Sequence, residues 1–259
     1  MKITPCDDNK EKLIRLWMKV FGDEREYIGL LFPDNEILCD VFAITDGDSI
    51  CAALYLLDCS LKFDGTIYKG KYLYAAATDE EHRNRGLMSA LIREAQSYCK
   101  KDGFDFISLV PADEWLYNYY GKFGFISAMY RTTVFNSEDK FGARLKKEIT
   151  GSEYFNKRSL RVDNCIMFDG ESIKYAVSCL EYNGLKFYED SDSQLFITEN
   201  DSYLFDEYIS ENTAMRYIVD NETKTQKRVT ERFGMLYPIN TELERDWNFT
   251  DIYMNIALD

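Results

Sequence analysis

The hydrophobic pattern of the first half of the chain alternates between the period of a helix and that of a strand. Apolar residues spaced three and four apart predict helices, whereas apolar runs bounded by turn residues predict strands. The predicted helices cover residues 8–21, 24–32, 86–102 and 113–123. The predicted strands cover residues 39–45, 50–58, 66–78, 104–110 and 125–135. Strands separated by helices imply an α/β layer that contains at least one parallel pair.

The second half of the chain has a less regular pattern. One amphipathic helix is predicted over residues 171–181, followed by Gly184 as a stop. Strands are predicted at residues 185–190, 194–199, 203–208, 214–220 and 252–259. A polar stretch, residues 136–140, separates the two halves, and the second half is the more acidic. We therefore predict two domains, residues 1–136 and residues 137–259, of which the second is a smaller α+β domain.

Charge and composition exclude several classes of function. The chain has 31 Lys and Arg residues against 45 Asp and Glu residues, a net charge of −14. A protein that binds nucleic acid without sequence preference needs a basic surface, so that function is not expected. No apolar run approaches the ~18 residues that span a bilayer, and the first residues lack the apolar core of a signal peptide. We expect a cytoplasmic protein with small cationic or neutral partners.

The cysteines and the single histidine give no metal motif. None of the seven cysteines forms C-x-x-C, so they are interpreted as reduced core residues. His82 is interpreted as a solvated loop residue, and no metal site is expected. Residues 65–71 fit the spacing of a phosphate-binding G-x-x-x-x-G-K loop, but Tyr72 replaces the Ser or Thr that such a loop needs.

The segment between the predicted strand 66–78 and the helix that follows has features of an anion site. Arg83, Arg85 and Gly86 lie where a tight turn enters the helix. Free backbone N–H groups and the helix dipole attract anions at such a position. Gly86 allows the backbone to approach a ligand closely. These features are those of a diphosphate cradle, but taken alone an Arg-x-x-Gly before a helix is more often only a turn.

A second segment, residues 119–125, carries the aromatic sequence Tyr-Tyr-Gly-Lys-Phe-Gly-Phe where a helix ends and a strand begins. Taken alone, it is an aromatic helix end that packs on the sheet. Together the two segments resemble the GCN5-related N-acetyltransferases, the GNAT superfamily. Arg83-x-x-Gly86-x-Met88 matches the first family motif, and Tyr120 to Phe125 matches the second. Met88 departs from the family pattern, which usually has Gly or Ala there.

The resemblance covers about residues 1–135 and is closest to the Eis-like branch of the superfamily. It implies a GNAT fold, a mixed central sheet with helices on both faces. The second domain is then either a degenerate GNAT-like half or an unrelated α+β lid. The implied enzyme is an acetyltransferase that moves an acetyl group from acetyl-CoA to an amine by direct attack, without a metal.

The resemblance also implies roles for individual residues. The pantetheine arm would contact the main chain of Ala76, Ala77 and Thr78. The pyrophosphate would be held by Arg83, Asn84, Arg85, Gly86, Leu87, Met88 and Ser89. Tyr120 would be the general acid that protonates the departing thiolate of CoA.

Three points stay open at the level of sequence. The general base is not identified: Asp79, Glu80 and Glu81 are interpreted as a solvated loop, while the C-terminal carboxylate of Asp259 and a water relay are alternatives. The acceptor is a small-molecule amine or an amine-bearing peptide. The alternative to an enzyme is a non-catalytic acyl-CoA-binding or regulatory module in which Tyr120 is structural.

Overall fold

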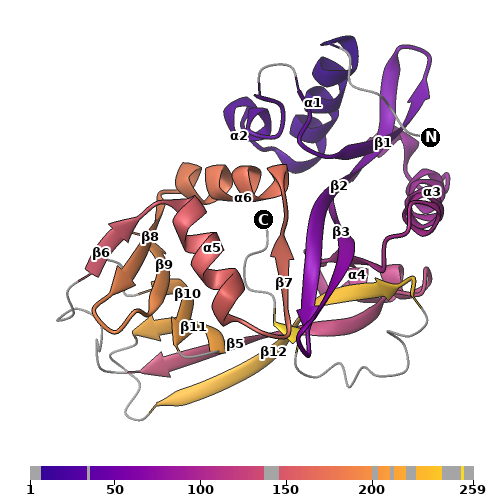
Figure 1. Ribbon diagram of the computed structural model, residues 1–259. Coiled ribbons are helices and arrows are strands. Elements are labelled where there is room, and N and C mark those ends of the chain that lie inside the picture. Colours follow the sequence, from indigo (N-terminus) through magenta and orange to yellow (C-terminus); the bar gives the residue numbers. More distant parts are fainter. Residues whose placement is uncertain are drawn as a thin grey trace.

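A long hairpin forms the centre of the computed structural model (Figure 1). β2 (Ser49–Phe63) pairs antiparallel with β3 (Thr66–Thr78), from Phe63 opposite Thr66 at the turn to Ala52 opposite Thr78. β1 (Asp40–Asp46) pairs with the outer edge of β2, and β4 (Phe106–Leu109) lies parallel to β3. The structure describes residues 7–33, 36–136, 146–199, 204–210, 213–219, 226–240 and 252–253.

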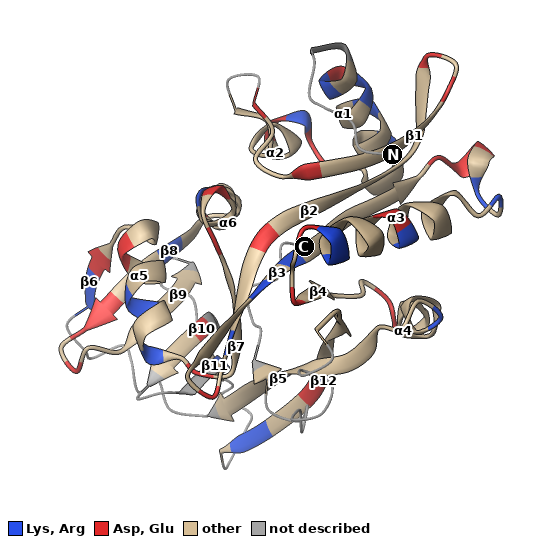
Figure 2. Ribbon diagram, turned by 45° about the vertical axis from the view of Figure 1, so that its right-hand side comes forward, with Lys and Arg blue, Asp and Glu red and all other residues tan. Residues whose placement is uncertain are grey.

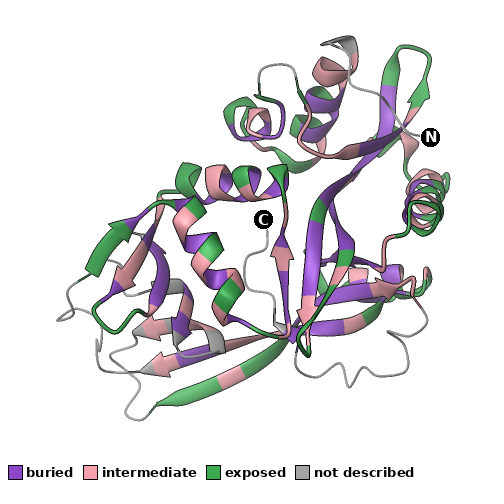
Figure 3. Ribbon diagram, viewed as in Figure 1, coloured by how far each residue is buried: buried purple, intermediate pink, exposed green. Residues whose placement is uncertain are grey.

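Helices cover both faces of this hairpin. Alternate side chains of β2 point to opposite faces, so Tyr55 and Leu57 join one core cluster and Leu54 and Leu56 join another. The first cluster lies under α1 (Asp7–Phe21) and α2 (Arg25–Gly29), the second under α3 (Leu87–Lys101) and α4 (Glu114–Gly121). β2 is accordingly buried over most of its length, and β3 is buried from Gly70 to Tyr74 (Figure 3). The predicted mixed sheet with helices on both faces is confirmed.

The rest of the chain adds strands to the same sheet. α5 (Gly151–Arg161) and α6 (Glu171–Tyr182) lie with β8 to β11 on the side of the molecule away from α3 (Figure 1). The remaining strands are β5 (Ile126–Asn136), β6 (Lys146–Ile149), β7 (Cys165–Phe168), β8 (Leu185–Asp190), β9 (Leu195–Glu199), β10 (Leu204–Ser210), β11 (Thr213–Val219), β12 (Lys227–Pro238) and β13 (Ile252–Tyr253). No helix in these described ranges is both long and apolar enough to cross a membrane.

Strands of the second predicted domain pair with strands of the first. β7 pairs with β2, and β12 pairs with both β4 and β5. The boundary at residues 136 and 137 stays a prediction, and residues 137–145 lie outside the described part. Sequence analysis missed β6, α5, β7 and β12. The first half of β12 is mostly exposed and charged, so it lacks the apolar alternation that predicts a strand.

β3 and β4 separate partway along their length. Their ladder runs only from Gly70 opposite Phe106 to Tyr72 opposite Ser108. Beyond it, the β2–β3 register shifts between Ala53 and Tyr55, and Ala75 adopts a φ of 45°. An extra residue in one strand bends that strand and increases its twist. The bend coincides with the divergence of β3 from β4, which leaves an opening between their C-terminal ends.

Within the ladder, the Phe106 ring of β4 packs closely on Gly70 of β3. A Cβ atom at this position would lie 2.3 Å from Cζ of Phe106, a ring that is fully buried. Gly70 therefore lies inside a strand, and residues 65–71 form a hairpin turn and the start of β3 rather than a phosphate-binding loop.

We expect Gly70→Ala to lower the free energy of unfolding by about 1–3 kcal/mol, because the added methyl group displaces the Phe106 ring. Urea denaturation measures this change. Gly29→Ala is the control: Gly29 has no atom within 4 Å of its Cβ position and lies in a helix, so this variant should lose no stability. Equal stability of the two variants would contradict the packing of Phe106 on β3.

Candidate functional site

The opening between β3 and β4 is a cavity of about 730 Å³. Its walls come from the end of α1, the diverging strand ends, α4, and the paired strands β5 and β12. Most of the lining residues are aromatic or apolar, and the polar ones are carboxylates and two arginines. It includes Trp17, Phe21, Asp23, Tyr72, Tyr74, Ala75, Ala76, Leu109, Val110, Pro111, Asp113, Glu114, Tyr117, Tyr120, Arg131, Glu231, Arg232 and Phe233.

Tyr120 contributes a protonated phenol to the cavity. It lies in the last turn of α4 and is only 7% exposed. Its ring packs against Tyr119 and Phe125, with centroids 5.4 and 5.8 Å away. Burial raises the pKa of Tyr120, and Tyr119 adds to the rise. Because the ordinary pKa of a phenol is already ~10, Tyr120 is protonated at neutral pH and can donate a hydrogen bond.

The segment from β3 to α3 turns sharply with the help of two left-handed residues. A 3₁₀ helix, η2 (Glu80–His82), is followed by Asn84 with a φ of 61° and Gly86 with a φ of 75°. Gly86 is the N-cap of α3, and open space surrounds its Cβ position. Figure 2 shows the basic stretch of this loop at the outer end of α3, next to an acidic stretch.

The start of α3 is suited to bind an anion. Its first intrahelical bond runs from Ala90 N to Gly86 O, so the N–H groups before Ala90 have no partner inside the helix. The first turn contains no acidic residue. Arg83 and Arg85 bond to the backbone carbonyls of Thr78 and Glu81, and no carboxylate among the described residues forms an ion pair with either.

Of the three acidic residues of the loop, Asp79 is not solvated as predicted but has a structural role. Asp79 accepts a hydrogen bond from the backbone N–H of Glu81 and forms an ion pair with Lys19 at 2.8 Å. The bond from Lys19 lowers the pKa of Asp79, which makes that carboxylate a poor proton acceptor. Glu80 and Glu81 are exposed, as the solvated-loop interpretation expects. Asp259, the alternative base, lies outside the described residues.

The structure places the predicted site residues along one path. Ala76 and Tyr120 line the cavity. Ala77 is buried in the core, and Thr78 is the last residue of β3. The loop and the first turn of α3 then carry Arg83, Asn84, Arg85, Gly86, Leu87, Met88 and Ser89. The side chain of Met88 packs against the core, so its size does not fill the exposed turn at residues 84–86.

Sequence analysis did not identify the polar residues of the cavity. Asp23 follows α1, and its carboxylate accepts a hydrogen bond from Nε1 of Trp17 at 2.7 Å. Arg131 on β5 pairs with Glu231 on β12 at 2.7 Å. Arg232 pairs with Glu114 of α4, and its guanidinium lies 3.8 Å from the centre of the Tyr117 ring. The two ion pairs join residues 100 and 118 positions apart, and no local pattern marks them.

A model of the acetyltransferase (GNAT) domain family matches residues 4–128. These residues belong to the GNAT superfamily. The match contains both β3 with its loop and the α4 segment with Tyr120. No curated protein sequence matches the chain.

Solved structures extend the likeness of fold beyond the GNAT domain. A conserved protein of unknown function from Enterococcus faecalis, described as a probable N-acyltransferase, has a TM-score of 0.70 at 13% identity over 93% of this chain and 72% of its own. Eis1 from Mycobacterium abscessus has a TM-score of 0.66 at 10% identity over 93% and 74%. A GCN5-related N-acetyltransferase from Kribbella flavida has a TM-score of 0.61 at 13% identity over 92% and 72%. At such identities the comparison shows the fold, which here includes both halves of the chain.

Proposed function

We propose that this GNAT protein is an acyl-CoA-dependent N-acyltransferase that moves an acetyl group from acetyl-CoA to an amine. One observation carries the proposal. Tyr120, a buried and protonated phenol, lines the cavity between the diverging strands, and β3 leads from that cavity to a cationic helix N-terminus. β3 therefore runs from the cavity that contains the proton donor to the site proposed for the anion.

The main chain of β3 supports binding of an extended pantetheine arm. β4 pairs with β3 only as far as Tyr72. Beyond Tyr72, no described strand pairs with this edge of β3, so residues 73–78 offer main-chain groups to a ligand. Ala75, Ala76 and Ala77 have small side chains that permit close approach. In this proposal Ala76, Ala77 and Thr78 contact the arm, and residues 83–89 hold the pyrophosphate.

Tyr120 acts as the general acid in this proposal. A thiolate leaves more readily when a proton donor lies close to the sulfur. The raised pKa keeps the Tyr120 hydroxyl protonated throughout the neutral range, and no described residue forms a hydrogen bond with it. The donor is therefore not already engaged by another protein group.

The charge of the cavity favours a cationic acceptor. Two of its carboxylates, Glu114 and Glu231, are paired with Arg232 and Arg131. The other two, Asp23 and Asp113, have no cationic partner among the described residues, which leaves the lining negative overall. A protonated amine is attracted to such a lining. The acceptor is thus a small-molecule amine or an amine-bearing peptide.

The alternative is a non-catalytic acyl-CoA-binding module. A thiol-release assay with acetyl-CoA and a panel of amines separates the two functions. The panel contains polyamines, aminoglycosides, an aromatic monoamine and peptides with free amino groups. Amine-dependent release of CoA supports the enzyme. Binding of acetyl-CoA in calorimetry, with no release above the rate of hydrolysis for any amine, supports the binding module.

Gly86→Glu should weaken CoA binding by more than tenfold, or ~1.4 kcal/mol. The substitution adds bulk and a negative charge where the proposal places the pyrophosphate. Calorimetry with CoA measures the change. Gly103→Glu is a matched control because Gly103 follows the same helix, has a φ of 76° and is likewise surrounded by open space. Both variants carry the same strain and charge, so an equal loss of affinity would contradict the assigned site.

Tyr120→Phe should lower kcat by at least about tenfold while CoA affinity stays within about twofold. The variant keeps the ring and its packing and removes only the proton donor. Steady-state kinetics on the best amine of the panel measures this effect. Tyr119→Phe is the control, because Tyr119 packs on Tyr120 and does not line the cavity. Wild-type turnover by Tyr120→Phe would mean that another group protonates the thiolate.

Asp23→Asn should raise KM for a dicationic amine by about 3–10-fold, or ~0.6–1.4 kcal/mol, with little change in kcat. Asparagine can still accept the hydrogen bond from Trp17, so the variant removes mainly the charge. Glu26→Gln, an exposed residue that does not line the cavity, removes the same charge and should leave KM unchanged. If Asp23→Asn leaves KM unchanged, Asp23 does not contact the acceptor.

A further inference from the structure

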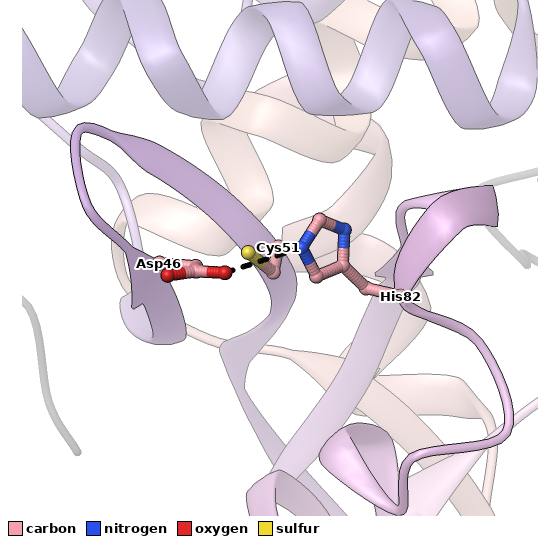
Figure 4. A group of neighbouring side chains, drawn as sticks. All are labelled: Asp46, Cys51 and His82. Carbon is pink, nitrogen blue, oxygen red and sulfur yellow. Dashed lines mark ion pairs between the residues drawn. The ribbon is translucent and has the colours of Figure 1, made fainter.

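Three donor side chains converge beside the loop that leads to α3. Asp46 ends β1, Cys51 lies near the start of β2, and His82 ends η2. One ligand atom from each lies within 4.8 Å of the other two. Figure 4 shows the sulfur of Cys51 next to the line that joins the Asp46 carboxylate to the His82 ring. The backbone positions them, because Asp79 N donates a hydrogen bond to Cys51 O at 2.9 Å and so holds η2 against β2.

The contacts within the protein do not account for the position of the His82 ring. Sequence analysis interpreted His82 as a solvated loop residue, but its side chain is only 19% exposed. Nδ1 is buried and has no hydrogen-bond partner. Nε2 lies 3.6 Å from Oδ2 of Asp46, which is longer than a hydrogen bond. Nε2 is the ring nitrogen that faces Asp46 and Cys51 (Figure 4). The lack of a good hydrogen bond at this nitrogen in a mostly buried imidazole is uncommon and indicates a partner other than protein.

The arrangement also differs from a nucleophilic triad. In a Cys-His-Asp relay, the carboxylate bonds to one ring nitrogen and the thiol to the other. Here the carboxylate faces Nε2 while Nδ1 has no partner, so the ring does not link the two groups through opposite nitrogens. Burial raises the pKa of the Cys51 thiol, with a further contribution from Asp46, which is the reverse of what an activated nucleophile needs.

The donor set is that of a zinc site. Zn²⁺ accepts thiolate sulfur, imidazole nitrogen and carboxylate oxygen, whereas Mg²⁺ and Ca²⁺ prefer oxygen donors alone. Bond lengths of ~2.0–2.3 Å place the ligand atoms of a tetrahedral site roughly 3.3–3.8 Å apart. The distance of 3.6 Å between Asp46 Oδ2 and His82 Nε2 already lies in that range, and no two of the three ligand atoms are more than 4.8 Å apart.

We propose that Asp46, Cys51 and His82 bind Zn²⁺, with the fourth position of the metal open to water. Binding replaces the proton of the Cys51 thiol by the metal. The site joins the β1–β2 hairpin to η2 and thereby fixes the base of the loop that carries residues 83–86. This proposal concerns metal binding alone and does not depend on the proposed acetyltransferase activity.

Titration of the full chain with ZnCl₂ tests the proposal, after treatment with a chelator and its removal. Calorimetry should show one strongly bound Zn²⁺ per chain and no binding of Mg²⁺. Asp46→Asn and His82→Ala should each weaken binding by at least tenfold. Asp46 lies at the turn of the β1–β2 hairpin and His82 in the loop before α3. Thermal unfolding without metal verifies that both variants fold. Zinc should raise the melting temperature of the wild type but not that of His82→Ala.

The other cysteines require a control, because a thiol elsewhere in the chain can bind zinc. Cys39→Ser removes a half-buried cysteine outside the site and should bind zinc like the wild type. Cobalt substitution should give a thiolate-to-cobalt absorption band that Cys51→Ser lacks. The proposal is overturned if the wild type binds no stoichiometric zinc, if His82→Ala and Asp46→Asn bind it as tightly as the wild type, or if Cys39→Ser removes the binding.

Discussion

The separation of β3 from β4 after the Tyr72–Ser108 pair is the constraint on which the rest of the structure depends. A continuous ladder would occupy both strand edges with hydrogen bonds and leave no cavity. The register shift and the positive φ of Ala75 bend β3 away from its neighbour. A non-glycine residue at such a φ costs about 1–3 kcal/mol, which the buried contacts on both faces of the hairpin offset.

The opening is completed by a segment distant in sequence. β12 pairs with β4 from Met235 to Pro238 and with β5 along most of its length, and it brings Glu231 and Arg232 to the cavity. Their ion pairs with Arg131 and Glu114 neutralise two of the four carboxylates that line the cavity. The second half of the chain therefore contributes part of the cavity lining, although the GNAT family match ends at residue 128.

The loop from β3 to α3 combines two requirements that its sequence satisfies locally. It must reverse direction quickly, which the left-handed residues Asn84 and Gly86 allow. It must also keep positive charge at the helix start, which the absence of acids from the first turn and the exposed Arg83 and Arg85 provide. Asp79 and Lys19 anchor the loop to α1. The same segment holds His82 against β2, so one short stretch serves both the proposed anion site and the proposed zinc site.

The sequence by itself determined the features that depend on neighbours in the chain. Hydrophobic period placed β3 and α3 correctly, and β2 as far as Asp58. The motifs around Gly86 and Tyr120 indicated the superfamily, because turn chemistry and helix starts are set within a few residues. Only the tertiary structure decided what depends on distant segments. The strand pairing of β12 and the ion pairs of Glu114 and Glu231 arise from contacts between elements far apart in sequence. The bend at Ala75 and the meeting of Asp46, Cys51 and His82 arise from the pairing and packing of consecutive strands with the loop that follows them, which no helical or strand period records.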